Sequence, residues 1–332
     1  MNQFLRLHAI WNPDVYHGWG REKKFFEGWY YKIVSKNEKY AFAIIPGIAM
    51  DEDGNKQSFI QILDGRQHHA EYHKFDHTSF RPTPKVHKLL IENNFFSKNK
   101  LRLDLPKIKG ELNFTELHPW SNSFLSPGIM GPYSFVPYME CYHGILSMNH
   151  KINGFIKYKE KNISFNDGKG YIEKDWGHSF PEAYIWMQSN HFSNPNLSIK
   201  ISIAIIPWLR SAFIGHIAGV LFKNRIIEFT TYNGSKVNYC DITKKIVEIE
   251  IENKLFVLSI MADREEATTL AAPISGFMSG RIDESMNSRI TLNLFDKKSN
   301  EVILNDTGNS AGIEVAGNYK KLLKKPSIKR VY

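Results

Sequence analysis

The sequence predicts an all-β protein with little helix. Apolar and polar residues alternate with a period of two along many short segments, and turn-forming pairs separate these segments. No apolar stripe with the helical period extends beyond about three turns. Many short strands at a spacing of roughly 8–12 residues are typical of a β-sandwich or a β-barrel.

The alternating segments lie in both halves of the chain. The clearest are residues 101–105, 198–203, 247–252 and 289–294. In a strand, this alternation turns apolar side chains to one face and polar side chains to the other. Tight turns are predicted at Asp53-Gly54, Asp64-Gly65, Asp167-Gly168 and Asn233-Gly234.

An internal repeat indicates that the strands form two domains. A segment that begins with tryptophan and ends in Ala-Ile-Ile-Pro occurs at residues 29–46 and again at 186–207, although chance similarity in an isoleucine-rich chain is the alternative. The length of 332 residues suits two domains of roughly 150 residues each. The strand pattern places the boundary at 178–181. We therefore predict domains at residues 1–178 and 179–332, each a barrel around a cavity of small-ligand size.

The charge of the chain does not indicate a nucleic-acid partner. The formal net charge is +9, but the basic residues are spread thinly and no nucleic-acid-binding motif accompanies them. The one concentrated basic patch is the C-terminal tail, for which a solvated tail is the simplest interpretation and contact with a membrane surface the alternative. This basic tail consists of Lys320, Lys321, Lys324, Lys325, Lys329 and Arg330.

The cysteine count and the apolar segments favour the cytoplasm. Cys141 and Cys240 are too few for a disulfide framework and suit a reducing compartment. Residues 1–13 contain no signal-peptide stretch, and charged residues interrupt the most apolar window, 199–222. We expect a cytoplasmic protein, with association to a membrane surface left open.

Aromatic residues make up 13% of the chain, and they favour strands and line ligand pockets. In a strand over residues 25–32, Glu27, Trp29 and Tyr31 share one face. A carboxyl group beside two aromatic rings on an inward face is desolvated, which raises its pKa and keeps it protonated near neutral pH. The alternative is that Glu27 pairs with a lysine or arginine while Trp29 fills the core.

A second cluster follows a loop rich in proline and glycine at residues 131–137. In the strand that comes next, Glu140 and Tyr142 lie on one face, and Cys141 and His143 lie on the other. A thiol nucleophile at Cys141 is disfavoured, since nothing in the sequence marks an oxyanion hole.

A third cluster lies further along the chain. Glu173 and Asp175 share a face of a predicted strand, and Trp186, Gln188 and Asn190 follow, again at period two. Because unpaired buried acids are costly, three clusters of acidic and aromatic residues exceed what packing requires. Together they indicate an aromatic pocket with a polar floor.

Metal and cofactor chemistry lacks a signature in this sequence. His69, His73 and His77 recur at a spacing of four, but their neighbours favour a strand, in which each such step spans about 13 Å. One metal ion cannot join all three at that spacing. The chain also has no G-x-S-x-G, G-x-G-x-x-G or Walker motif. We therefore expect no metal and no cofactor.

The three clusters lie within longer blocks of distinctive sequence. These blocks are Tyr16-His17 and residues 25–32, 131–137, 139–144, 170–177, 179–181, 186–192, 272–273 and 312–315. In them the sequence resembles the tocopherol cyclase family over nearly the whole chain. The long central blocks are far more specific than a lone short motif.

This resemblance implies a fold of two lipocalin-like antiparallel β-barrels in tandem, similar to that of carotenoid hydratases and related cyclising enzymes. It also implies an isomerase that needs no cofactor and no redox change. In the implied reaction, the phenolic hydroxyl of a prenylated quinol adds across the nearest side-chain double bond and a chromanol ring forms. An acid must protonate the alkene, and aromatic faces must stabilise the tertiary cation. An acid in apolar surroundings keeps its proton at neutral pH.

The resemblance suggests roles for the clustered residues. The candidates for the proton donor are, in order, Asp175, Glu140, Glu173 and Glu27. The candidates for the wall that faces the cation are Trp29, Tyr31, Trp176 and Trp186. The candidates for positioning the quinol are Tyr142, His143, Gln188 and Asn190.

The substrate stays open at this point. Cyclisation or hydration of another prenylated compound is one alternative, and a carrier that binds a lipophilic isoprenoid without catalysis is another. A carrier would tolerate loss of Asp175 and Glu140, whereas an enzyme would lose turnover and still bind product analogues. Exposed aromatic residues near a barrel mouth, assisted by the basic tail, are expected to allow a peripheral membrane contact.

Overall fold

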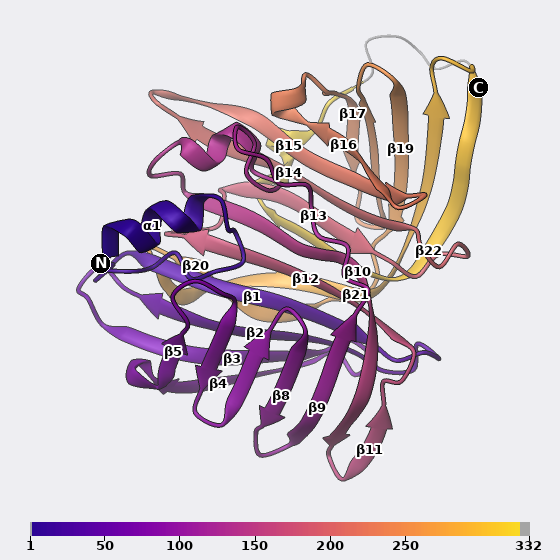
Figure 1. Cartoon of the computed structure of the whole chain (residues 1–332). Coiled ribbons are helices and arrows are strands. Elements are labelled where there is room, and N and C mark those ends of the chain that lie inside the picture. Colours follow the sequence, from indigo (N-terminus) through magenta and orange to yellow (C-terminus); the bar gives the residue numbers. More distant parts are fainter. Residues whose placement is uncertain (1, 326–332) are drawn as a thin grey trace. The chain divides into compact units, whose positions relative to one another are not determined.

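The structure of the protein, a computed structural model, describes residues 2–325 of the chain. This part of the chain consists mainly of β-strands (Figure 1). Within this described part, the one α-helix is α1 (Asn2–Ile10), and no helix is long and apolar enough to cross a membrane. The prediction of an all-β protein with little helix is confirmed. Two residues of the basic tail, Lys329 and Arg330, lie outside the described residues. Short 3-10 turns are η1 (His77–Ser79), η2 (Gly131–Phe135), η3 (Thr231–Asn233) and η4 (Tyr319–Leu322).

The first sheet contains twelve strands from the N-terminal part of the chain, and its described strands pair in antiparallel fashion. Its order is β4-β3-β2-β1-β12-β10-β9-β8-β7-β6-β5, with β11 paired to β10. The strands are β1 (Phe25–Val34), β2 (Ala41–Met50), β3 (Lys56–Asp64), β4 (His69–Asp76), β5 (Phe80–Pro82), β6 (Lys88–Ile91), β7 (Asn94–Ser97), β8 (Lys100–Asp104), β9 (Ile108–Thr115), β10 (Cys141–Tyr158), β11 (Lys161–Ser164) and β12 (Gly168–Gly177).

The second sheet contains ten strands from the C-terminal part. Its order is β16-β15-β14-β13-β22-β21-β19-β18-β17, with β20 paired to β21. The strands are β13 (Ala183–Ser189), β14 (Ser198–Trp208), β15 (Ser211–Phe222), β16 (Arg225–Thr230), β17 (Lys236–Ile242), β18 (Ile246–Glu252), β19 (Phe256–Asp263), β20 (Thr268–Ile274), β21 (Phe277–Asp296) and β22 (Glu301–Gly317).

The chain divides into two compact units. The first unit contains the residues up to 180 together with the hairpin Thr268–Ile282, formed by β20 and the start of β21. The second unit contains the segment Pro181–Ala267 and the residues from 283 onward.

The hairpin Thr268–Ile282 contacts the first unit through its backbone. The N–H of Met50 donates to the carbonyl of Gly276 at 3.0 Å, and the N–H of Ala271 donates to the side-chain oxygen of Gln61 at 2.9 Å. The sequence alone places this hairpin with the residues after 178, because strand counting cannot detect a contact between segments some two hundred residues apart.

Both sheets follow the same order of strands. The first strand of each pairs with the second and also with the last, so β1 lies between β2 and β12, and β13 lies between β14 and β22. The repeated sequence segments, residues 29–46 and 186–207, fall on the first two strands of each sheet. This shared topology supports the predicted duplication.

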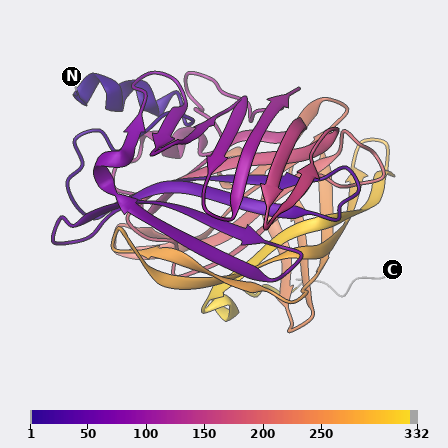
Figure 2. The same cartoon turned by 90° about the horizontal axis from the view of Figure 1, so that it is seen from below.

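Each sheet is curved, and its two end strands are consecutive along the chain (Figures 1 and 2). In the first sheet β4 leads through η1 into β5, and in the second β16 leads through η3 into β17. The strand pairs described do not join these ends by a ladder of hydrogen bonds. The described strands therefore form two β-sheets. Closure of each sheet into a lipocalin-like barrel stays a prediction.

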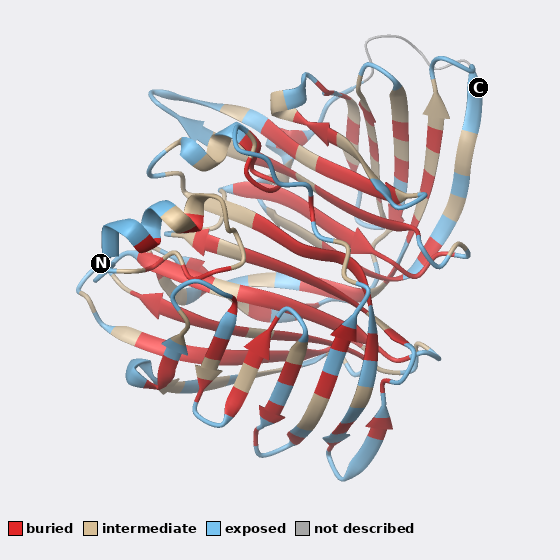
Figure 3. Cartoon of the chain, in the orientation of Figure 1, coloured by how far each residue is buried: buried red, intermediate tan, exposed pale blue. Residues whose placement is uncertain are grey.

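Each unit has its own apolar core on one face of its sheet. The first core joins Trp29 and Tyr31 of β1 to Leu101 and Leu112 of β8 and β9, which lie far along the sheet from β1. A sheet can bring such distant strands to one core only by curling around it. In Figure 3, buried residues alternate with exposed ones along the outer strands, as the period-two pattern predicts.

The predicted alternations supply the second core as well. Ile199, Ile201 and Ile203 of β14 belong to it, and so do Ile249 of β18 and Ile290 of β21. Burial of such side chains stabilises the fold by about 1.5–3 kcal/mol each. The period of two thus decides which face of each strand becomes buried.

Candidate functional site

Strand β12 carries different functional side chains on its two faces. It lies between β1 and β10, and its residue Trp176 pairs with Glu27 on one side and with Tyr142 on the other. The side chain of Trp176 belongs to the apolar core. Because neighbouring residues point to opposite faces, Asp175 and Glu173 lie on the face turned away from that core.

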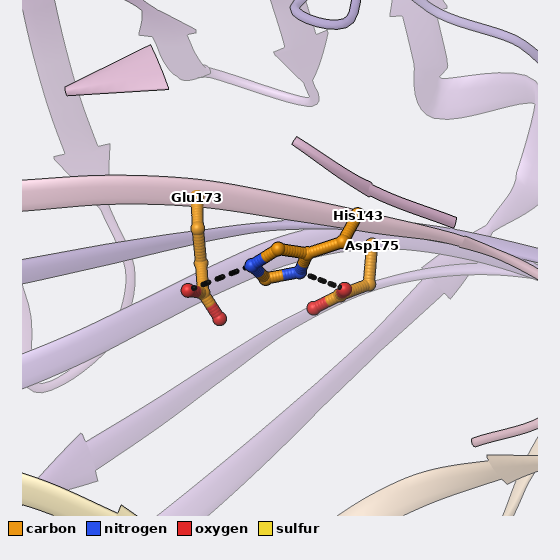
Figure 4. Close-up of side chains that lie close together, drawn as sticks. All are labelled: His143, Glu173 and Asp175. Carbon is orange, nitrogen blue, oxygen red and sulfur yellow. Dashed lines mark hydrogen bonds and ion pairs between the residues drawn. The ribbon is translucent and has the colours of Figure 1, made fainter. Parts of the chain in front are cut away.

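The outer face of β10 and β12 carries a cluster of two carboxylates around one imidazole (Figure 4). His143 pairs directly with Asp175 across the two strands, and its Nδ1 lies 2.5 Å from Asp175 Oδ1. On the other side of the ring, His143 Nε2 lies 3.5 Å from Glu173 Oε2. The hydroxyl of Tyr171 donates a hydrogen bond to this same Oε2.

The members of this cluster differ in their exposure to solvent. The side chain of Glu173 is 5% exposed, that of His143 is 12% exposed and that of Asp175 is 22% exposed. Burial, followed by the charge of Glu173, raises the pKa of Tyr171 well above its ordinary value. Tyr171 therefore remains a hydroxyl that donates to Glu173 at all ordinary pH values. The cluster runs from a buried end to an end that reaches solvent.

This arrangement suits proton transfer. A neutral imidazole accepts a proton at one nitrogen and releases one at the other, and here each nitrogen has a carboxylate beside it.

The ligand atoms of His143, Glu173 and Asp175 also lie within 4.8 Å of one another, so these residues are where a metal ion could be held. However, the carboxylates flank opposite ring nitrogens, and a single ion could reach both only if side chains rotated.

The inner face of the same strands carries a buried ion pair. Lys174 Nζ lies 2.5 Å from Glu27 Oε1, and both side chains are fully buried. The carboxylate of Glu27 also accepts from the backbone N–H of His17 at 2.9 and 3.0 Å and from that of Gly18 at 3.2 Å. This geometry matches the alternative in which Glu27 has a lysine partner, because every part of the carboxylate is engaged by a donor.

Lys174 also occupies the aromatic faces beside this pair. Its Nζ lies 4.8 Å from the ring centre of Trp29 and 4.7 Å from that of Trp176. The same Nζ is 2.7 Å from Nδ1 of His17, whose ring stacks on Trp176 at 4.0 Å. Burial lowers the pKa of His17, so its neutral ring accepts a hydrogen bond from the lysine ammonium. Burial also lowers the pKa of Lys174, against the charge of Glu27.

Two predicted wall residues, Trp29 and Tyr31, lie within the first core. Trp29 is 1% exposed and stacks on His87, with ring centres 5.2 Å apart. Tyr31 is completely buried, and its hydroxyl lies 2.5 Å from His87 Nε2. Their polar groups are thus hydrogen-bonded inside the core, since Trp29 also donates to the carbonyl of Asp14 at 3.1 Å.

An open pocket of about 860 Å³ adjoins both faces at this end of the strands, and a pocket of that size suits a small-molecule ligand. His143 lines it, as do Tyr142 and Trp176, whose rings stack 5.5 Å apart and nearly parallel. The hydroxyl of Tyr142 donates to the carbonyl of Val136 at 2.6 Å, which anchors the loop after η2 as one wall. Its other lining residues include Ile10, Pro13, Phe25, Phe135, Pro137, Tyr138 and Met139.

Glu140 lies directly before β10. Its backbone carbonyl accepts from the N–H groups of His178 at 3.0 Å and Ser179 at 3.3 Å. Glu140 therefore holds the chain where β12 ends, next to the pocket residues Gly177 and His178.

The second unit carries its own group of predicted site residues on β13. Ile185 and Met187 of this strand belong to the second core, so Trp186 and Gln188 lie on the opposite face, and both are buried. Asn190 follows the strand and is 1% exposed. Trp186 and Gln188 thus share one face of β13, and Asn190 continues their period of two just beyond the strand; we call these three residues the β13 line.

A carboxylate and a glycine accompany this line in the second unit. Tyr184 precedes Trp186 on the same face and donates to Glu314 Oε2 of β22 at 2.7 Å. Gly312 leaves room for the indole, because a β-carbon there would lie 2.7 Å from Trp186 Cζ3. The sequence pattern did not single out Tyr184, since its partner Glu314 lies 130 positions away in sequence.

Two further residues of the first unit were not predicted. Lys174 lies between Ile172 and Trp176 on the inner face, and a lysine between two apolar residues of one face requires a buried partner. The position of Lys174 between two apolar residues of one strand face could therefore have been recognised in the sequence. Tyr171 likewise shares its period-two face with Glu173.

The three histidines at a spacing of four lie on β4 and η1, where His69 and His73 contact Glu71 at 3.2 and 3.4 Å.

Comparisons with known proteins support the family resemblance seen in the sequence. A family model described as tocopherol cyclase-like matches residues 106–317, which is more than half of the chain and includes both the imidazole cluster and the β13 line. The chain is 27% identical over 193 residues to chloroplastic tocopherol cyclase of Zea mays, a match that covers 54% of this chain and 40% of that protein. It is 22% identical over 251 residues to a probable chloroplastic tocopherol cyclase of Oryza sativa subsp. japonica, covering 72% and 52%. The chain thus spans about half the length of these curated relatives or less.

Solved structures share the fold at low sequence identity. The crystal structure of CghA with Sch210972 superposes with a TM-score of 0.55 at 9% identity and covers 88% of each chain. The crystal structure of a putative AttH from Nitrosomonas europaea superposes with a TM-score of 0.51 at 11% identity, covering 88% of this chain and 92% of that one. These likenesses concern the fold alone.

Proposed function

The chain belongs to the tocopherol cyclase-like family, and from this premise we propose that it is an isomerase that cyclises a prenylated quinol to a chromanol by proton transfer. The observation that carries the proposal is the position of His143, which lies between the carboxylates of Asp175 and Glu173 and lines a pocket with aromatic walls. A proton source beside a lipophilic pocket is what this reaction requires.

The proposed reaction balances without any added reactant. The His143–Asp175 pair transfers a proton to the less substituted alkene carbon of the substrate, and a tertiary cation forms at the neighbouring carbon. The phenolic oxygen attacks that carbon, the C–O bond closes the ring, and the phenolic proton returns to the pair. Product and substrate are isomers, so neither oxidant nor reductant is consumed.

The first unit supplies an aromatic surface for the cation. The rings of Tyr142 and Trp176 line the pocket beside His143, and cation–π attraction is worth about 2 kcal/mol or more at a desolvated site. We assign Tyr171 and Glu173 to positioning the imidazole, since Glu173 contacts Nε2 and is itself held by the tyrosine hydroxyl. Trp186, Gln188 and Asn190 belong to the second unit and do not line this pocket, so their roles stay predictions from the family resemblance.

Glu27 and Lys174 are proposed to support the site rather than to act in the reaction. Glu27 accepts from two backbone N–H groups and a lysine, so it is held as an anchor for residues 17–18. Trp29 is buried in the core, as Glu27 is. Among the four candidate acids, Asp175 remains our first choice for the proton donor, because it combines contact with His143 and partial exposure.

The proposal is tested by an anaerobic incubation with a prenylated benzoquinol in mild detergent and heavy water. Chromatography separates the chromanol, and mass spectrometry counts the deuterium bound to carbon. We expect one such deuterium in the product of the wild-type protein. Asp175→Asn and His143→Gln are each expected to lower turnover by about 10²–10⁴-fold, because a missing general acid costs that much.

Asp167→Asn is the matched control, since Asp167 is 67% exposed and forms a surface pair with Lys36. This variant should retain full turnover. A carrier function would instead give ligand binding without product in every variant, and full turnover by a folded Asp175→Asn protein would contradict the assigned proton source. Ligand binding is followed by the rise in melting temperature, so loss of turnover is separable from loss of the pocket.

A further inference from the structure

Helix α1, which lines the pocket through Arg6 and Ile10, carries apolar side chains that the fold leaves exposed. On α1, Leu5 and Ala9 are buried, whereas Phe4 is 80% exposed and Leu7 is 54% exposed. Phe4 and Leu7 are three residues apart, so they share the outward face of the helix. An apolar face turned to solvent indicates an interaction surface.

A second exposed segment presents two apolar residues at the tip of a tight turn. Phe124 and Leu125 are each 74% exposed. The turn is closed by reciprocal backbone hydrogen bonds, in which Ser123 donates to Ser126 at 3.1 Å and Ser126 donates to Ser123 at 3.3 Å. The fold therefore holds this pair outward instead of folding it into the core.

Trp11 joins the two segments into one surface. Its ring stacks on Phe124 at 5.5 Å and meets Phe135 edge-on at 5.7 Å, while its indole N–H donates to the carbonyl of Phe124 at 2.9 Å. Asn122 also donates to the carbonyl of Trp11 at 2.7 Å. We call this surface the apolar rim, and its exposed members are Phe4, Leu7, Phe124, Leu125, Phe135 and Tyr138.

The rim adjoins a pocket wall that carries positive charge. Phe135 and Tyr138 belong to the rim and also line the pocket. The same pocket wall includes four basic residues and one acidic residue: Arg6, Arg21, Lys23, Lys24 and Glu52. Lys24 Nζ lies 2.8 Å from Glu52 Oε1, which leaves three cations without a balancing carboxylate among the described residues of that wall.

We propose that the apolar rim docks this protein on an anionic lipid surface, with Phe124 and Leu125 inserted among the acyl chains and the basic residues facing the headgroups. The combination of outward-held apolar residues with uncompensated cations is the pattern by which proteins lie at a membrane interface. A protein partner of ordinary composition would need matching acidic residues, whereas anionic lipid supplies both the charge and the apolar phase. The proposal draws on the proposed function in one respect, that a lipophilic substrate enters the pocket from the lipid.

Vesicle binding tests the proposal directly. The wild-type chain is mixed with vesicles of phosphatidylcholine alone or with added phosphatidylglycerol, and the bound fraction is measured by flotation. We expect binding to the anionic vesicles that weakens as salt is raised. The double variant Phe124→Ser/Leu125→Ser should lose at least about tenfold in affinity, because two buried apolar side chains are removed from the interface.

Phe155→Ser is the matched control. Phe155 is 57% exposed on β10 of the same unit but lies fourteen residues along that strand from the pocket end. This control should bind vesicles as the wild type does. The proposal is overturned if the wild type ignores anionic vesicles, or if the double variant binds them equally well.

Two further readouts distinguish lipid docking from self-association and from loss of the active site. A concentration-dependent dimer that Phe124→Ser/Leu125→Ser abolishes, in a protein that ignores vesicles, would make the rim a contact between two copies and overturn the proposal. Turnover in detergent distinguishes failure of docking from failure of the proposed function. Neither Phe124 nor Leu125 lines the pocket, so the double variant should turn over soluble substrate normally even when it no longer binds vesicles.

Discussion

At the scale of single residues, the Lys174–Glu27 pair explains how a charged pair is tolerated inside the first core. Each charge loses its hydration on burial, and this cost is offset only where geometry and hydrogen bonds are good. Here the carboxylate has the ammonium and two backbone N–H groups as donors, and the ammonium faces two indole rings. The pair therefore ties the N-terminal segment to β1 and β12.

We predict that Lys174→Met lowers the free energy of unfolding by about 3–5 kcal/mol, because it leaves the buried Glu27 carboxylate without its partner. Urea denaturation followed by circular dichroism measures this loss. The double variant Lys174→Met/Glu27→Leu should recover part of it, since no uncompensated charge remains.

Lys36→Met provides the control, because Lys36 forms a 3.0 Å pair with Asp167 in which both side chains are largely exposed. Its effect should stay below about 1 kcal/mol. If Lys174→Met were as mild as Lys36→Met, the buried pair would not have the structural role that we assign to it.

At the scale of elements, β12 and β13 have buried residues on both faces. One face of each strand packs into the core, and the other carries the site residues, with Glu173 on β12 and Gln188 on β13. A strand of this kind can hold large side chains only where a neighbouring strand offers space. On β22, that space is provided by Gly312 beneath Trp186.

We predict that Gly312→Ala displaces the Trp186 indole. The added β-carbon would lie 2.7 Å from Cζ3 and 2.9 Å from Cη2 of the ring, so one of the two strands must shift. Overpacking of this kind costs about 1–3 kcal/mol of stability. Near-ultraviolet circular dichroism reports the movement of the tryptophan, and urea denaturation reports the cost.

Gly28→Ala on β1 is the comparison, since a β-carbon there would lie no closer than 3.6 Å to any atom, which is ordinary contact. Gly312→Ala should therefore destabilise the protein clearly more than Gly28→Ala. Equal effects would mean that space beneath Trp186 is not what Gly312 provides.

At the scale of the whole molecule, both units bury neutral histidines. Burial lowers the pKa of His87 and of His150 to about 3 in the first unit, and that of His216 to about 4 in the second. An unfolded histidine has a pKa of about 6.5. Below about pH 6.5 the histidines of the unfolded chain bind protons that the buried histidines of the folded chain do not bind, so acid favours unfolding.

We predict that stability is constant with respect to these groups above about pH 6.5 and falls as the pH drops toward their folded pKa values. The loss is at most about 1.4 kcal/mol per pH unit for each histidine. Urea denaturation at pH 7, 6 and 5 measures the slope. His216→Asn should make the slope shallower, since asparagine does not titrate, and a slope equal to that of the wild type would contradict the prediction.

Several features of the molecule followed from the sequence because they depend on local pattern. The alternation at residues 198–203 predicted both a strand and its buried face, and the period-two spacing of Glu173 and Asp175 predicted that they share a face. The resemblance to the tocopherol cyclase family rested on blocks that the family match covers in large part. The partner of Glu27 was left between two alternatives, because a lysine 147 positions away in sequence cannot be assigned by periodicity.

The sequence by itself determined the class of fold, the strand faces and the family, since each of these depends on residue order along one strand or one block. Only the tertiary structure decided which faces meet. Antiparallel register sets His143 opposite Asp175, and the curl of the sheet buries Lys174 between two indoles. The same fold leaves Phe124 and Leu125 outside any core. The physical reason is that pairing and burial depend on contacts between segments distant in sequence, which no local period encodes.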